Sequence, residues 1–150
     1  MNHLELKKIL VEECKKQQQK VIDNLKSTMS EAQQSANEYG PPKDRYDSFR
    51  MQLLRKKDMF GQQLEKALSE WYALEKIDLK KEMTKVGFGS VIYTNDQKIF
   101  ISIGLGKITA VKETFLAISL MVPLSKSLLE KQKGDIVLFN GKKIEIKEIF

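Results

Sequence analysis

The sequence predicts an α+β protein in which a long antiparallel helical hairpin precedes a small antiparallel sheet domain with one short helix. Two observations predict the hairpin. Residues 4–38 contain neither Gly nor Pro, and a Gly-Pro-Pro turn separates them from a second helical pattern. A third predicts the sheet: after Asp78 the apolar residues no longer recur at helical spacing but form short β-branched runs bounded by turn residues.

The first helix is expected over residues 4–38, where residues of high helix propensity dominate. Residues seven apart form an a/d seam typical of a coiled coil, apolar at first and polar toward its end. One set of seam positions comprises Leu4, Val11, Gln18, Leu25, Ala32 and Tyr39, and the interleaved set includes Cys14, Val21, Thr28 and Ser35. A helix of about 35 residues has a length of roughly 50 Å, too long and thin to enclose a core.

The second helix is expected to resume from Tyr46, with Asp44 as its N-cap. Its apolar positions follow three- and four-residue steps and are Phe49, Leu53, Phe60, Leu64, Ala67 or Leu68, Trp71 and Leu74. Because the connection is short, the second helix must run antiparallel to the first. An alternative is that further helices complete a bundle through oligomerisation.

The sheet domain is expected over residues 79–150, with a linker at 79–85, after a hairpin of residues 1–78 whose tip is 39–44. "VIYT" and "KIFISIG" predict a pair of strands. The apolar run 114–122 predicts a buried strand. Pro123 then predicts the start of a helix that Gly134 ends. Asn140-Gly141 predicts a type I′ turn between the last two strands.

Composition excludes several kinds of protein. No apolar run approaches the length of a membrane span, and the charged start is unlike a signal peptide, so a cytoplasmic protein without a membrane partner is expected. With Cys14 and His3 as the single residues of their types, a Cys/His zinc site is excluded. The net charge is +6, of which +5 lies in residues 79–150. This excess favours a nucleic acid or an acidic protein surface, or serves solubility alone.

The second half resembles a known family. "VGFGSVIYTND" (86–96), "ISLMVPLSKSLLEKQKGDIVLF" (118–139) and the terminal "IEIKEIF" resemble the C-terminal domain of the bacterial GreA/GreB transcript-cleavage factors. The resemblance implies an FKBP-like sheet domain preceded by a coiled coil that enters the secondary channel of RNA polymerase. Motif similarity is confined to residues 86–150, and the order of elements extends it over the chain.

The family's chemistry implies specific roles for parts of this chain. Acidic residues at the coiled-coil tip would help to hold a Mg²⁺ shared with the polymerase active site, so the factor would at most stimulate the polymerase's own RNA hydrolysis and would not itself be an enzyme. The docking turn corresponds to Met121, Val122 and Pro123. A basic patch toward nascent or backtracked RNA would comprise Arg50, Arg55, Lys56 and Lys57. As an alternative, these four residues form a solvated helix face.

The tip departs from the family pattern. If Tyr46 is aligned with the family's tip tyrosine, Tyr39 and Pro42 stand where two carboxylates are expected. Three acids remain nearby as candidates for the catalytic role, namely Glu38, Asp44 and Asp47. Lys43 and Arg45 lie between them and would oppose a bound dication.

The sequence therefore predicts a monomeric Gre-like factor that binds core RNA polymerase and has weak or absent transcript-cleavage stimulation. Two alternatives stay open. One is an active cleavage factor that uses the three tip acids. The other is an adaptor or structural protein whose sheet domain binds a different partner.

Overall fold

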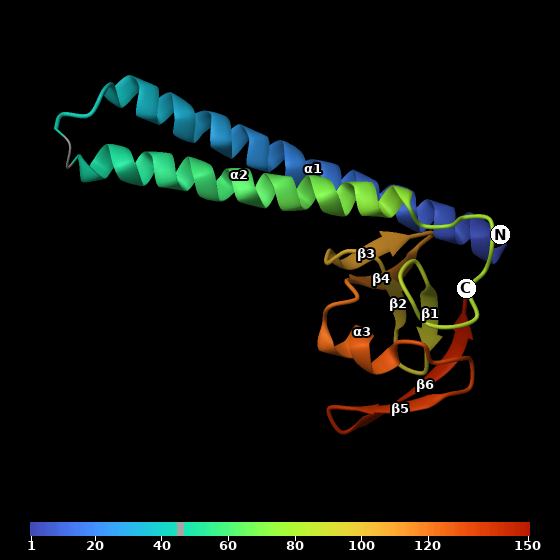
Figure 1. Ribbon diagram of the computed structural model, residues 1–150. Helices are drawn as coiled ribbons and strands as arrows, with labels where there is room; N and C mark the ends of the chain where they lie inside the picture. Colours follow the sequence, from blue (N-terminus) through green and yellow to red (C-terminus); the bar gives the residue numbers. More distant parts are fainter. Residues whose placement is uncertain (45–46) are drawn as a thin grey trace. The chain divides into compact units, whose positions relative to one another are not determined.

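The computed structural model describes residues 1–44 and 47–150. These form two compact units (Figure 1), one of Gln18–Trp71 and one of Met1–Gln17 with Tyr72–Phe150. The division differs from the predicted boundary at residues 78 and 79. The first turns of the first helix and the last turn of the second belong with the sheet, because their apolar side chains share its core.

Two long helices account for the first half of the chain. Helix α1 spans His3–Tyr39 and helix α2 spans Ser48–Glu75. Helix α1 begins with a capping box: Asn2 Oδ1 accepts the Glu5 N–H at 2.8 Å, and Glu5 Oε2 accepts the Asn2 N–H at 3.3 Å. No helix among the described residues has the length and apolar character needed to cross a membrane.

Within the unit of residues 18–71 the two helices form the expected antiparallel hairpin. The Gln18 side-chain amide donates to the Ala67 carbonyl at 3.0 Å, which pairs the start of one segment with the end of the other. The first predicted seam set is correct, since Gln18 and Ala32 are buried. The interleaved set is correct at Cys14, which is buried, but is wrong by one position beyond it: Ile22 and Ala36 are buried, whereas Val21 is 40% exposed.

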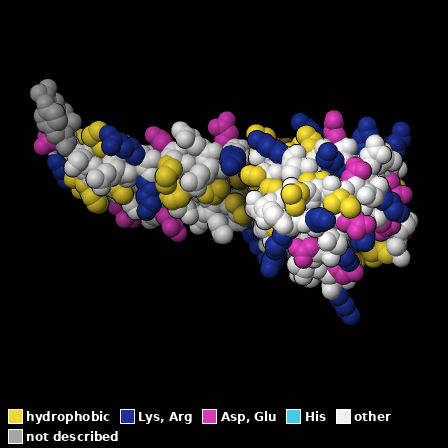
Figure 2. All heavy atoms as spheres, turned by 90° about the horizontal axis from the view of Figure 1, so that it is seen from below, with side chains coloured by type: hydrophobic (Ala, Val, Ile, Leu, Met, Phe, Trp, Pro, Cys, Tyr) yellow, Lys and Arg dark blue, Asp and Glu magenta, His cyan; other side chains and the backbone are white. Residues whose placement is uncertain are grey.

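Among the described residues of this unit, the exposed large apolar side chains are Val21, Phe49, Met51 and Met59. Hydrophobic side chains are visible along the helices in Figure 2. A Cβ added at Gly61 would make an ordinary contact with the Met29 Cε at 3.7 Å. A shallow surface groove of about 270 Å³ lies between the two helices and is lined by Lys26, Met29, Ser30 and Gln33 of α1 and by Lys57 and Leu64 of α2.

The sheet has six strands in the order β3-β4-β2-β1-β6-β5. The strands and the short helix α3 are β1 Val91–Thr94, β2 Lys98–Ile101, β3 Gly106–Ala110, β4 Glu113–Ile118, α3 Pro123–Leu128, β5 Ile136–Phe139 and β6 Lys142–Ile149. The fold class is confirmed, with one difference: β2 and β4 pair in parallel, so the sheet is mixed and not purely antiparallel. The strand β3, which the sequence pattern did not predict, separates them along the chain and makes this crossover possible.

Helix α3 ends at Leu128, six residues before Gly134. Leu129 has a ψ of 133° and Glu130 a φ of 63°, and neither value is helical. The helix therefore ends well before the predicted glycine. Asn140 and Gly141 have φ values of 49° and 77°, as the predicted type I′ turn requires.

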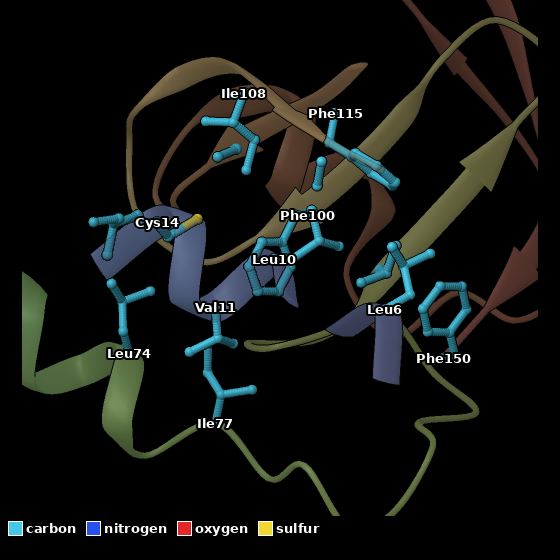
Figure 3. Close-up of a cluster of buried hydrophobic side chains, with 14 residues drawn as sticks. Leu6, Leu10, Val11, Cys14, Leu74, Ile77, Phe100, Ile108, Phe115 and Phe150 are labelled. Carbon is cyan, nitrogen blue, oxygen red and sulfur yellow. The ribbon is translucent and has the colours of Figure 1, made fainter. Parts of the chain in front are cut away.

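The main core joins the helices to the sheet (Figure 3). Leu10 and Cys14 of α1 and Leu74 of α2 meet Phe100 and Phe115 of the sheet, all at most 1% exposed. The amphipathic first turns of α1 thus cover one face of the sheet. A second cluster, which includes Ile92, Ile99, Leu128 and Ile146, fills the space between the sheet and α3.

The Gly-Ser segment that begins β1 has a structural role. The buried Ser90 hydroxyl donates to the Gly87 carbonyl at 2.7 Å and accepts the Gly87 N–H at 3.1 Å. Gly89 has φ +89, and a Cβ there would lie 3.1 Å from Ile77 Cγ2. The segment "VGFGSV" therefore contains a tight turn that packs against Ile77, two residues after the end of α2.

Candidate functional site at the hairpin tip

The tip begins where α1 ends at Tyr39. Gly40 has φ +88, and its N–H donates to the carbonyls of Ala36 and Asn37 at 3.2 and 3.1 Å. Glycine reaches this left-handed conformation without the penalty that a Cβ imposes. Two consecutive prolines follow and exclude helix at this point.

Asp47 organises the turn. Its Oδ1 accepts the Arg50 N–H at 3.2 Å and the Tyr39 hydroxyl at 3.0 Å, and its Oδ2 accepts the Lys43 N–H at 2.9 Å. Because α2 begins at Ser48, the Asp47 carboxylate is bonded to the third helical residue, which is the geometry of an N-cap. The prediction that Asp44 caps this helix is wrong; its carbonyl instead accepts the Asp47 N–H at 3.3 Å.

These bonds set the protonation of the tip. The Lys43 N–H, assisted by the Arg50 N–H and the Tyr39 hydroxyl, lowers the pKa of Asp47 below its usual value. Desolvation and the hydrogen bond to Asp47 raise the pKa of Tyr39. The carboxylate is therefore ionised at neutral pH, and within residues 1–44 and 47–150 its hydrogen bonds come from Tyr39, Lys43 and Arg50.

The three candidate acids are not brought together around one point. Glu38 Oε1 accepts a 3.1 Å hydrogen bond from the Gln34 amide one turn earlier on α1. Across residues 1–44 and 47–150, no group of three or more His, Cys, Asp or Glu side chains is arranged to hold a metal ion. Arg45 and Tyr46, on which the alignment with the family tip depends, lie outside the described residues.

The four candidate RNA-binding residues do not form one stripe. Arg50 and Lys57 are seven apart and share one side of α2, both partly buried, whereas Arg55 and Lys56 are exposed on other sides. The Arg50 Nε donates to the Gly40 carbonyl at 2.9 Å, so this guanidinium closes the turn. The sequence did not reveal this role, although an arginine three residues after a capping aspartate is a local signal that can be sought.

The candidate docking turn presents an apolar side chain. Met121 is 72% exposed, Val122 occupies the N-cap position of α3 without a side-chain cap, and Pro123 is the first helical residue. The Ser119 Oγ accepts the Met121 N–H at 3.2 Å, and the buried Ser125 hydroxyl donates to the Ser119 carbonyl at 2.6 Å. Two serines thus brace the loop that holds Met121 outward.

No family model matches the chain, and no curated protein matches it. Among solved structures it is similar to the crystal structure of GreA factor homolog 1 (Gfh1) protein of Thermus thermophilus. The two share 16% identity over 91% of this chain and 94% of the other, with a TM-score of 0.35. Similarity at this level gives no residue-by-residue correspondence.

Proposed function

We propose that this chain is a Gre-like factor that binds core RNA polymerase through its sheet unit and modulates elongation by placing its helical hairpin in the secondary channel. The sequence similarity of residues 86–150 to the Gre C-terminal domain supports the polymerase partner. The order of elements, a long helical hairpin followed by a small mixed sheet, is consistent with it.

We further propose that the factor stimulates little or no transcript cleavage. The observation that carries this is the state of Asp47, whose two carboxylate oxygens accept three hydrogen bonds from Tyr39, Lys43 and Arg50. A Mg²⁺ ligand must offer free oxygen lone pairs at short distance. Recruiting Asp47 to a metal would compete with the hydrogen bonds that hold the turn.

Polymerase binding is tested by co-elution of the purified chain with core RNA polymerase and by competition with an authentic GreA factor. Met121→Asp should weaken binding, because it places a charge on the exposed apolar residue of the docking turn. Val111→Asp, at an exposed apolar position in the β3–β4 turn, is the matched control and should bind normally. Absence of any complex with the wild-type chain would refute the polymerase function.

Cleavage is tested by incubating the chain with a backtracked elongation complex and following the 3′ end of the RNA. We expect no acceleration over polymerase alone. Cleavage at the rate given by GreA would favour the active alternative, and loss of that cleavage in Glu38→Ala or Asp44→Ala would identify the ligands.

A further inference from the structure

We propose that the free edge of strand β5 binds an extended segment of a partner protein in which apolar and acidic residues alternate. β5 is the last strand of the sheet and reads Ile-Val-Leu-Phe, with no charge, Gly or Pro. Ile136 and Leu138 are 64% and 69% exposed. An apolar edge of this kind is a template for pairing with another strand.

The backbone of β5 is unpaired on its outer side. In the β5–β6 pair the register is Ile136↔Glu145, Val137↔Ile144, Leu138↔Lys143 and Phe139↔Lys142. Because residues flanking a two-residue turn exchange hydrogen bonds, Phe139 and Val137 point their amides toward β6. Ile136 and Leu138 therefore point their N–H and C=O groups outward. No described residue forms a hydrogen bond with these groups.

On the β6 side of the same hairpin, outward-pointing backbone groups are satisfied by hydrogen bonds from another part of the chain. Lys143 and Glu145 of β6 also point their backbone groups away from their partner strand. Asn95 takes these up: its N–H and its side-chain amide donate to the carbonyls of Glu145 and Lys143 at 3.2 Å each, and its Oδ1 accepts the Glu145 N–H at 3.0 Å. β5 has no such cover among the described residues.

The other edge strand is also protected. Strand β3 carries Gly106 and the exposed Lys107, residues that discourage edge pairing. Within the part of the chain that the structure describes, β5 is thus the edge that is both apolar and uncovered. In Figure 2, which views the molecule from the β5 side of Figure 1, hydrophobic side chains lie among Lys and acidic side chains over the sheet unit.

The lysines around β5 favour a partner strand that carries acidic residues. Residues 126–147 hold six Lys and three acidic residues, and Lys133, Lys142 and Lys143 near the ends of β5 are exposed. A second copy of β5 paired antiparallel would place Lys133 of one copy beside the turn that carries Lys142 of the other. This like-charge contact disfavours self-pairing and favours an acidic strand.

The two faces of β5 differ in chemistry, which is why we expect apolar and acidic residues to alternate in the partner segment. On one face a partner strand would lie beside Ile136 and Leu138, which suits apolar side chains. On the other face, that of Phe139 and Ile144, lies a cavity of about 550 Å³. Its lining is mixed in character and includes Thr94, Asn95, Asp96, Gln97, Asn140, Lys142 and Lys143, so that two lysines stand against one acid. Acidic side chains of the added strand that project on this face would lie on the same side of the hairpin as the exposed Lys142, which pairs with Phe139.

The test uses the full-length chain and a fluorescent peptide of alternating valine and glutamate, with a valine–lysine peptide of equal length as control. We expect the acidic peptide to bind at least about tenfold more tightly than the basic one, because only the acidic peptide complements the lysines. Amide resonances of Ile136 and Leu138 should shift most on titration.

Leu138→Pro removes one outward N–H without touching the bonds to β6, a change that edge strands tolerate. It should weaken binding by about tenfold or more, as loss of a backbone hydrogen bond and a side-chain contact predicts. Val111→Lys, at the opposite edge, should leave binding unchanged. Equal binding of both peptides, unchanged affinity in Leu138→Pro, or a concentration-dependent dimer that Leu138→Pro abolishes would overturn the proposal.

Discussion

The Tyr39 hydroxyl donates a 3.0 Å hydrogen bond to the Asp47 carboxylate, which joins the last residue of α1 to the residue that caps α2. The ring of Tyr39 also packs at 5.0 Å from that of Phe49 in the first turn of α2. Tyr39 therefore links the two helices both by a hydrogen bond to Asp47 and by ring packing against Phe49.

Asp47→Asn should loosen this turn, because the amide accepts hydrogen bonds less strongly and cannot provide the negative charge at the helix N-terminus. We expect faster hydrogen exchange at the amides of Arg50 and Met51, with the sheet unit unaffected. Glu38→Gln, which lies on α1 near the tip, should leave that exchange unchanged.

Acid should have the same effect as the substitution. The pKa of Asp47 is lowered on folding, so its contribution to stability is present above its ordinary value of 3.8 and is lost as pH falls through the lower folded value. A wild-type chain whose Arg50 amide exchange is insensitive to pH in that window, after correction for intrinsic exchange, would contradict this account.

Gly61→Ala should raise the free energy of unfolding by roughly 1 kcal/mol, from helix propensity alone. The added Cβ would make an ordinary contact with Met29 at 3.7 Å. Gly40→Ala is the matched control. Open space surrounds Gly40, but its φ of +88° penalises a Cβ, so this substitution should lower the free energy of unfolding. Thermal melting of both variants separates the two effects, and a lower melting temperature for Gly61→Ala would show that Met29 cannot adjust.

Lys7 is fully buried on α1, and its ammonium has no hydrogen-bond partner among the described residues. Burial lowers its pKa, while Asp78 and Glu82 partly oppose this. Between the lowered value and 10.5 the unfolded chain binds more protons, so this group makes stability rise with pH.

Lys7→Met should therefore raise the free energy of unfolding at neutral pH by roughly 1–3 kcal/mol and remove that rise. Denaturant titrations at a series of pH values measure both effects. The exposed neighbour Lys8→Met serves as control and should keep the wild-type slope. A Lys7→Met variant with the wild-type pH dependence would show that the buried lysine is not the titrating group.

The β3–β4 turn is strained. Val111 and Lys112 have φ values of 46° and 64°, a left-handed conformation that costs L-residues roughly 1–2 kcal/mol each. Exchanging the pair for Asn and Gly should raise the melting temperature, since these residues suit a two-residue turn.

The reverse exchange provides the control for that experiment. Asn140→Val with Gly141→Lys, in the turn with similar φ values, should lower the melting temperature. If either exchange left the melting temperature equal to that of the wild type, the left-handed residues of these turns would carry no energetic penalty.

Much of the fold could be predicted because it depends on neighbours in sequence. The absence of Gly and Pro before Tyr39, the double proline and the Asn140-Gly141 turn are local signals, and the helices and the final hairpin follow from them. Strand β3 escaped prediction because Gly106 and Lys107 are poor strand formers, and only pairing with β4 makes this segment extended.

At the candidate site the sequence by itself determined which residues are available: three acids, two prolines and a glycine between two helices. Only the tertiary structure decided that Asp47 caps α2, that Arg50 closes the turn, that Lys7 is buried and that β5 is an edge which no described residue covers. The physical reason is that each of these depends on which groups satisfy a hydrogen bond or exclude water, and those partners lie on other elements of the fold or across a turn.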